Sequence, residues 1–257
     1  MSAVMRPSVS VVIPALNEER NLPLLAESMP PDVDEIIVVT GDSQDNTTAE
    51  GRRLWPNGTH LRQSRRGKGN ALACGFAAAS GDIIVTLDAD GSADPADIPR
   101  LVEALVAGAD FAKGSRFARG DRRADITRLQ AVGNKLLNGL VNILFRADYT
   151  DVCYGFSAFW RHRLDVIDMP DVAVSTPQWG DGFEIETLIN LRLASRGAKV
   201  VEVASTGASR IPQHGSVNVI SDGLGVLTTI QREFRRARTG SQATLAGMSG
   251  SRQARPG

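Results

Sequence analysis

Short apolar runs of strand length alternate along this chain with longer segments of helical periodicity, and this alternation is the strongest constraint on the fold. The strand-like runs lie at about 9–13, 34–40, 82–88, 109–113 and 198–203. Helical patterns lie at about 19–28, 45–54, 68–79, 95–107, 126–145 and 182–196. Strands separated by helices of this length form mostly parallel sheets, because each helix returns the chain to the start of the next strand. We predict a single α/β domain with a mostly parallel central sheet and helices on both faces.

Two carboxylates follow one of the predicted strands. An apolar run ends at Asp88, and Asp90 comes one residue later. Open α/β sheets bind ligands beyond the carboxyl ends of their strands, so we expect these charges to face a ligand. Paired oxygen ligands suit Mg²⁺ or Mn²⁺, which keep other coordination positions for water and substrate phosphates. Asp is also common as a cap before Gly and Ser, and Asp-x-Asp alone does not separate the two interpretations.

Three further segments share this organisation. Residues 8–19 and 35–47 are apolar runs that end in polar residues, and residues 65–76 place a basic, glycine-rich turn at a predicted helix start. The turn is not a Walker A loop, because Gln63 stands where that motif needs Gly and Gly69 where it needs Ser or Thr. We expect its glycines to let the backbone approach a ligand, with the helix N-terminus and Lys68 favouring negative charge.

The overall composition excludes several classes of protein. With 257 residues, 42% of them hydrophobic, the chain can bury one substantial core. The 29 basic and 29 acidic residues give a net charge of zero, so we expect no general attraction to nucleic acid. Cys74 and Cys153 are too few for a disulfide framework. No apolar window reaches 18 residues and no signal core is evident, so we expect a protein that is cytoplasmic or peripheral on the cytoplasmic membrane face.

These four motifs, in this order and each at a strand end or helix start, resemble the family 2 glycosyltransferases of the GT-A fold. Within that family the chain resembles the polyprenyl-phosphate (dolichyl-phosphate) mannose and glucose synthases over about residues 8–235. The resemblance implies a nucleotide-sugar donor, with Asp88 and Asp90 holding Mg²⁺ or Mn²⁺ on its diphosphate. Thr40 and Gly41 depart from the commoner Asp-Asp-Gly-Ser motif, which leaves uridine and guanosine as alternatives. The donor-binding residues implied are Pro14, Asn17, Glu18, Asp42, Asp45, Lys68, Asp88, Ala89 and Asp90.

The resemblance also implies an acceptor site. The segment Phe111–Arg116 leads into an arginine-rich stretch and then a helix, and by position Arg116 and Arg128 would meet the acceptor phosphate. Guanidinium groups suit phosphate because their donors form bidentate pairs. Arg210 and His214 fall where relatives have an acceptor loop, and we assign them a role near the diphosphate or acceptor phosphate. The apolar face of the helix at 126–145 is interpreted as core rather than as a lipid groove.

Three carboxylates are candidates for the reaction centre. Asp151, in a segment that resembles the family's Asp-x-x-x-Gly motif, would orient the sugar or acceptor, although a strand-end cap is the competing interpretation. Glu184 and Glu186 open a predicted helix, which also suits the helix dipole, and the resemblance places one of them, with Glu184 preferred, beside the reacting atoms.

The predicted reaction is transfer of a hexose, with inversion, from a nucleotide sugar of the GDP-mannose or UDP-glucose type to a polyprenyl phosphate at a membrane surface. One alternative is an enzyme of the same fold that acts on a soluble hydroxyl acceptor such as a natural product or polysaccharide precursor. Another is a nonenzymatic nucleotide-sugar-binding module, against which the intact Asp88 and Asp90 argue. We predict an N-terminal extension at 1–7, a catalytic domain at 8–238 and a disordered tail at 239–257.

Overall fold

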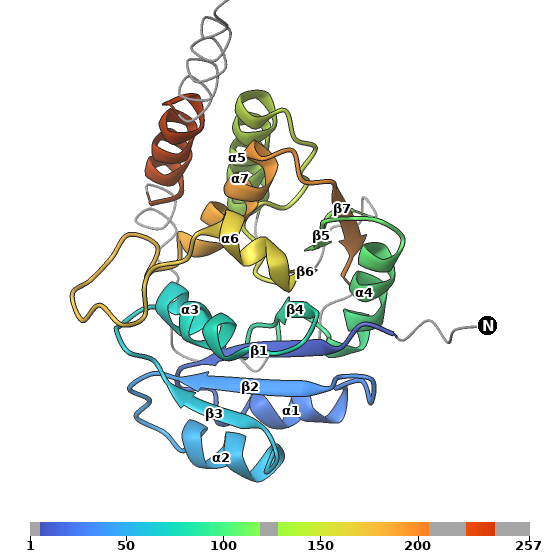
Figure 1. Ribbon diagram of the computed structural model, residues 1–257, viewed down its shortest axis with the longest axis vertical. Helices are drawn as coiled ribbons and strands as arrows, with labels where there is room; N and C mark the ends of the chain where they lie inside the picture. Colours follow the sequence, from blue (N-terminus) through green and yellow to red (C-terminus); the bar gives the residue numbers. More distant parts are fainter. Residues whose placement is uncertain (1–5, 119–127, 206–224, 240–257) are drawn as a thin grey trace, which may run out of the picture.

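The computed structural model describes residues 6–118, 128–205 and 225–239, without the side chains of 128–131 (Figure 1). The predicted N-terminal extension and tail lie mostly outside these ranges, so the limits of the domain stay a prediction.

Seven strands form one sheet in the order β3-β2-β1-β4-β6-β5-β7. All neighbouring pairs are parallel except the two that involve β6, which runs antiparallel to both β4 and β5. The mostly parallel sheet predicted from the alternation is therefore confirmed. The strands are β1 (Val9–Ala15), β2 (Glu35–Thr40), β3 (Thr59–Arg62), β4 (Ile83–Thr86), β5 (Phe111–Ser115), β6 (Ser157–Trp160) and β7 (Val200–Ala204).

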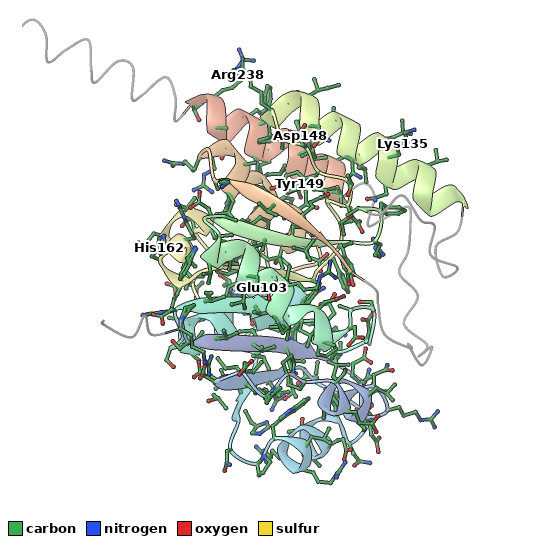
Figure 2. The ribbon with its side chains drawn as sticks, turned by 90° about the vertical axis from the view of Figure 1, so that its right-hand side faces the viewer. Glu103, Lys135, Asp148, Tyr149, His162 and Arg238 are labelled. Atoms are coloured by element: carbon green, nitrogen blue, oxygen red, sulfur yellow. The ribbon has the colours of Figure 1, made fainter. Side chains whose placement is uncertain are left out.

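Helices cover both faces of this sheet (Figure 1). They are α1 (Leu22–Glu27), α2 (Thr47–Leu54), α3 (Lys68–Ala78), α4 (Ile98–Val106), α5 (Arg128–Phe145), α6 (Leu164–Ile167) and α7 (Ile185–Ser195), with 3₁₀ turns at Pro95–Asp97 and Arg161–Arg163. Residues 225–239 are also helical. This last segment runs beside α5 in Figure 2, where the Phe145 and Phe234 rings lie 6.0 Å apart.

Alternate residues of the strands enter two separate hydrophobic cores, as the two-residue period of a strand requires. Val11 and Ile13 of β1 belong to the core that contains α1 and α4. Val12, between them, belongs to the other core, which contains residues of α3, α5 and α7. Burial on both faces explains why the central strands are continuous apolar runs.

Two strands were not predicted from the sequence. β3 (Thr-His-Leu-Arg) is a four-residue edge strand with no buried residue. β6 (Ser-Ala-Phe-Trp) is equally short and inserts between β4 and β5 from far along the chain. Neither length nor alternation distinguishes such segments from loops, because their strand state depends on neighbours that the sequence does not place beside them.

Candidate active site

The carboxyl ends of β1, β2, β4 and β5 share one edge of the sheet, because these strands point the same way. β6 begins at this edge because it runs in the opposite direction. The segments that follow β1, β2, β4 and β5 therefore meet there with the segment that precedes β6. This edge gathers most of the residues singled out in the sequence.

A buried cluster of three charged side chains lies at this edge. The Nζ of Lys68, the first residue of α3, lies 2.6 Å from Oδ1 of Asp88, which follows β4. The same Nζ also forms an ion pair with Oε1 of Glu186, in the first turn of α7. The three side chains are only 14 to 21% exposed. Two helix starts and a strand end thus bring one cation to two carboxylates.

Gly155 forms one wall of this cluster. A Cβ added to it would lie 2.5 Å from Oδ2 of Asp88 and 2.9 Å from Nζ of Lys68, and would also meet Oε1 of Glu186. Any side chain at position 155 would displace the ends of these three side chains. The glycine of the predicted Asp-x-x-x-Gly segment therefore leaves the cluster in this arrangement.

The protonation of the cluster reflects burial and mutual attraction. Burial opposes the charge on Lys68, but Asp88 and Glu186 outweigh it and raise the pKa of the ammonium. Burial raises the pKa of Glu186, Lys68 acts against this, and Asp88 adds to it. Lys68 is therefore charged, and Glu186 holds its proton more tightly than an exposed glutamate does.

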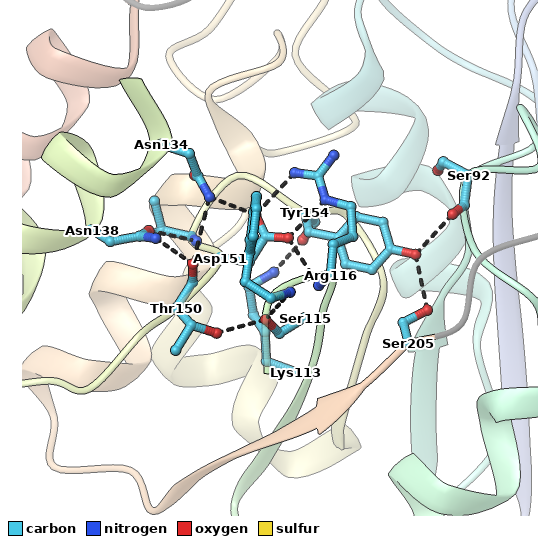
Figure 3. Close-up of polar contacts among 12 residues, drawn as sticks. Ser92, Lys113, Ser115, Arg116, Asn134, Asn138, Thr150, Asp151, Tyr154 and Ser205 are labelled. Carbon is cyan, nitrogen blue, oxygen red and sulfur yellow. Dashed lines mark hydrogen bonds and ion pairs between the residues drawn. The ribbon is translucent and has the colours of Figure 1, made fainter. Parts of the chain in front are cut away.

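Arg116 and Asp151 form a second pair beyond the end of β5. Nε of Arg116 donates to Oδ2 of Asp151 at 2.7 Å, and Nη2 donates to Oδ1 at 2.9 Å. Asp151 is fully buried, and the guanidinium also lies 4.8 Å from the ring centroid of Tyr154 (Figure 3). Tyr154 also directly precedes Gly155, which forms one wall of the Lys68 cluster. Asp151 positions Arg116 in this arrangement and is not a free base.

Three asparagines spaced four residues apart on α5 hold the segment that carries Asp151. Nδ2 of Asn142 donates to the carbonyl of Tyr149 at 2.9 Å, and Oδ1 of Asn138 accepts from the Val152 amide at 2.9 Å. Nδ2 of Asn134 donates to Oδ1 of Asp151 at 3.2 Å (Figure 3). Residues at this spacing share one helix face. The sequence analysis missed this ladder, although the period of four was visible.

Lys113 is a second buried lysine that the sequence analysis left without a role. It lies in β5, is 1% exposed, and donates from Nζ to the carbonyl of Tyr154. Burial lowers the pKa of Lys113, against the attraction of Asp151 and Glu186. A lysine inside a strand-like apolar run was the available signal, because lysine is almost never fully buried unless it is paired.

The loops after β1 and β2 bind each other at the same edge of the sheet. Asn17 has a left-handed backbone (φ 58°) and accepts from the Gln44 amide at 2.7 Å. Asp45 accepts from Thr47 and from the Glu19 amide. Burial disfavours the ionised form of Asp45, but the hydrogen bonds from Thr47 prevail and lower its pKa. Asn17 and Asp45 thus shape the loops.

Other predicted donor-side residues lie around these loops. Oε2 of Glu18 accepts from the side chain of Asn21 at 2.8 Å, and Pro14 lies in β1 opposite Val39. Asp42 is exposed and forms an ion pair with Arg62 at the rim of a cavity of about 420 Å³. Thr40 and Gly41, which depart from the family's motif, line the same cavity. Its lining residues are Thr40, Gly41, Asp42, Ser43, Thr48, Arg52, His60, Leu61 and Arg62.

The glycine-rich turn before α3 has a packing role that was not predicted. A Cβ on Gly67 would collide with the carbonyl of Asp181, and one on Gly69 with the carbonyl of Gly180. The amides of Gly69 and Asn70, at the start of α3, donate to the carbonyls of Gly182 and Asp181. These glycines therefore allow the 180–182 loop to approach, and two amides of the helix start are occupied by protein.

Glu184, preferred in the sequence analysis, lies in that loop region and not in the cluster. Its Oε1 accepts from the amides of Gly180 and Gly182 at 3.0 and 3.2 Å. Glu186 contacts Lys68 instead. The two glutamates are two residues apart at a helix start, so they point in different directions, and only the tertiary structure distinguishes them.

The apolar residues of α5 divide between core and surface, which corrects the interpretation of that face as core. Val141 is fully buried, and Leu137 packs against the same core. The α5 stripe, by contrast, is exposed; it comprises Val132 (56%), Leu136 (71%), Leu140 (37%) and Ile143 (80%). Within the described ranges, no helix combines the length and apolarity needed to cross a bilayer.

The remaining predicted residues are placed only in part. Ala89 is buried between Asp88 and Asp90, and Oδ1 of Asp90 accepts from the Ser92 amide at 2.9 Å. Arg128 begins α5, but its side chain lies outside what the structure describes, and Arg210 and His214 lie outside it entirely.

The carboxylates at the end of β4 suit a divalent cation that a substrate helps to coordinate. The ammonium of Lys68 already stands as a cation at Asp88, which shows that this position attracts positive charge. Over the described ranges, no group of three or more His, Cys, Asp or Glu side chains gathers as a complete ligand set. Mg²⁺ and Mn²⁺ accept such incomplete sites, because phosphates and water supply the other ligands.

Comparison with known proteins agrees with this arrangement. The polyprenol monophosphomannose synthase of Mycolicibacterium smegmatis is 33% identical over 221 residues, which cover 81% of each chain. The dolichol-phosphate mannosyltransferase of Pyrococcus furiosus is 30% identical over 207 residues, which cover 77% of this chain. The chain spans 56% of that protein's length and 27% of a still longer curated glycosyltransferase.

A solved structure shares the fold. Glucosyl-3-phosphoglycerate synthase from Mycobacterium tuberculosis, in complex with Mn²⁺, UDP and phosphoglyceric acid, matches with a TM-score of 0.68 at 23% identity, over 89% of this chain and 78% of that one. The family model for "Glycosyl transferase family 2" matches residues 10–167, more than half of the chain. The protein therefore belongs to glycosyl transferase family 2 and has the GT-A fold.

Proposed function

We propose that this glycosyltransferase moves a hexose from a nucleotide sugar to a polyprenyl phosphate, with inversion and with the help of Mg²⁺ or Mn²⁺. The observation that carries this proposal is that all three candidate bases are already engaged. Asp151 accepts from Arg116, Glu186 pairs with Lys68, and Glu184 accepts from backbone amides. A hydroxyl acceptor needs a base to remove its proton, whereas a phosphate monoester is anionic at neutral pH and needs none.

Arg116 supplies the cation that such an acceptor requires. Asp151 uses Nε and Nη2, and Nη1 makes no hydrogen bond to any residue in the described ranges. The adjacent helix α5 carries Asn134, which contacts Asp151, and also the exposed α5 stripe. Exposed apolar side chains on the helix that carries Asn134 suit an enzyme that meets its acceptor, a phosphate attached to a membrane-embedded isoprenoid chain, at a bilayer surface.

The chemistry assigns a role to each part of the edge. A phosphate oxygen of the acceptor attacks the anomeric carbon as the bond from that carbon to the donor's diphosphate breaks. Lys68, fixed at the start of α3, lies where it can neutralise charge that develops on the departing diphosphate. When bound, the cation at Asp88 and Asp90 would stabilise the same charge. Asp151 orients Arg116 toward the acceptor.

The names of the relatives support the lipid-phosphate acceptor. Two of the matching proteins are named for mannose transfer to dolichol phosphate or polyprenol monophosphate. They do not fix the sugar or the nucleotide for this chain, because the end of β2 and the loop that follows depart from the family's motif at Thr40 and Gly41.

The test is a screen of UDP- and GDP-sugars with a short-chain polyprenyl phosphate and Mg²⁺ or Mn²⁺, with product masses measured. We expect a polyprenyl phosphohexose and no product from the matching unphosphorylated polyprenol. Arg116→Lys keeps the charge but removes the bidentate geometry, and we expect a raised KM for the acceptor with little change for the donor. Arg53→Met, which removes an exposed cation paired with Glu50, is the matched control. A preference for the alcohol would refute the proposal.

A second candidate is transfer to a soluble hydroxyl acceptor, and one observation favours it. The raised pKa of Glu186 is a property that a general base near neutral pH needs. If Lys68 moved away, Glu186 could accept a proton. Product formation from hydroxyl acceptors that is lost in Glu186→Gln would favour this candidate.

A further inference from the structure

Lys68 forms an ion pair with Asp88, one of the two carboxylates proposed to hold the metal ion. Its Nζ is 2.6 Å from Oδ1, which is a normal distance for a charge-assisted hydrogen bond. Neither partner is well solvated, since their side chains are 14% and 21% exposed. The ammonium is therefore a resident counter-ion of the carboxylate.

The charged atoms of this cluster lie close together. Oδ2 of Asp88, Oε1 of Glu186 and Nζ of Lys68 all lie within 2.9 Å of the position that a Cβ on Gly155 would take. A divalent ion bound to Asp88 would therefore lie close to the ammonium of Lys68. An ammonium and a dication on the same buried carboxylate would also repel each other strongly, because water screens them poorly there.

We propose that Lys68 is a built-in counter-ion that a divalent cation and the nucleotide diphosphate displace together. Before the donor binds, the ammonium of Lys68 is paired with Asp88 and Glu186. When the cation takes Asp88, the diphosphate accepts the released ammonium. This inference rests on the proposed nucleotide-sugar donor but not on the acceptor. Metal and nucleotide should consequently bind cooperatively, each strengthening the other by the same factor.

The test measures Mn²⁺ binding without nucleotide, by the electron paramagnetic resonance signal of free Mn²⁺. We expect Lys68→Met to bind Mn²⁺ at least about tenfold more tightly than the wild type, because the competing charge is gone. In saturating Mn²⁺, calorimetric titration with UDP and with GDP should show weaker nucleotide binding to Lys68→Met, since the diphosphate loses its ammonium. Arg53→Met removes a distant positive charge and should match the wild type in both assays.

A second pair of variants covers a loss of stability in Lys68→Met, which leaves two buried carboxylates without their cation. Lys68→Met combined with Glu186→Gln removes one charge of each sign and should still bind Mn²⁺ more tightly than Glu186→Gln alone. Equal Mn²⁺ affinity with and without Lys68, or no Mn²⁺ binding by any variant, would overturn the inference. Failure to glycosylate polyprenyl phosphate would refute the proposed function and leave this result standing.

Discussion

Gly155→Ala is expected to disable the enzyme while leaving it folded. The added Cβ would lie 2.5 Å from Oδ2 of Asp88, where 3.4 Å is the lower limit of ordinary contact, so the charged groups must retreat by about 0.9 Å. A displacement near 1 Å at a reaction centre costs on the order of a hundredfold in rate. Gly155 does not have a positive φ, so the effect is one of space and not of backbone strain.

The stability cost follows from the same geometry. Overpacking by one methyl group costs about 1 to 3 kcal/mol. For a domain of this size each kcal/mol lowers the melting temperature by about 2 to 4 °C, so we expect a decrease on the order of 2 to 12 °C. The loss of turnover should be far larger than this modest destabilisation explains at assay temperature.

The assay pairs sugar transfer with thermal unfolding followed by circular dichroism. Gly139→Ala on α5 is the matched control, because nothing lies within 4 Å of its added Cβ. Alanine is the better helix former, so this variant should be neutral or up to about 1 kcal/mol more stable. Wild-type turnover in Gly155→Ala, or an equal loss in Gly139→Ala, would show that the cluster above Gly155 is not needed for activity.

Two further predictions concern acid stability and membrane binding. Burial opposes the ionised form of Asp181, but hydrogen bonds from the buried Arg65 outweigh it and lower the pKa of Asp181 below the ordinary 3.8. The ion pair therefore stabilises the folded state above pH 3.8. This stabilisation is lost as the pH falls through the lowered pKa. Asp181→Asn should lower the free energy of unfolding by about 3 to 5 kcal/mol at neutral pH. Urea unfolding measured from about pH 2 to 7 should show that the difference from the wild type becomes smaller in acid. A difference that does not depend on pH would contradict this prediction. The double variant Leu136→Glu, Ile143→Glu should bind anionic phospholipid vesicles more than about tenfold more weakly in a co-sedimentation assay, with an unchanged melting temperature. The reason is that two exposed apolar side chains can no longer enter the bilayer surface. Unchanged sedimentation would show that the α5 stripe does not contact lipid.

The sequence by itself determined the fold class and the edge at which the site lies. Continuous apolar runs alternating with helices predict a parallel sheet, and carboxylates after a buried strand predict a charged ligand-binding edge. Asp88, Asn17 and Asp42 lie at this edge as expected, because strand direction alone brings the ends of parallel strands together. The resemblance to family 2 glycosyltransferases, based on these motifs, was confirmed by the match to the family model and by the relatives.

Tertiary structure alone decided which side chains meet. Lys68 and Glu186 are separated by 118 positions, and only the packing of α3 against α7 brings them together. The packed structure brings Glu186 and not Glu184 to Lys68, places the 180–182 loop against Gly67 and Gly69, and leaves half of the apolar face of α5 exposed. Periodicity reports which face of an element is apolar, but not which neighbour covers it. Contacts between distant segments depend on how the whole chain packs, so a local sequence pattern does not predict them.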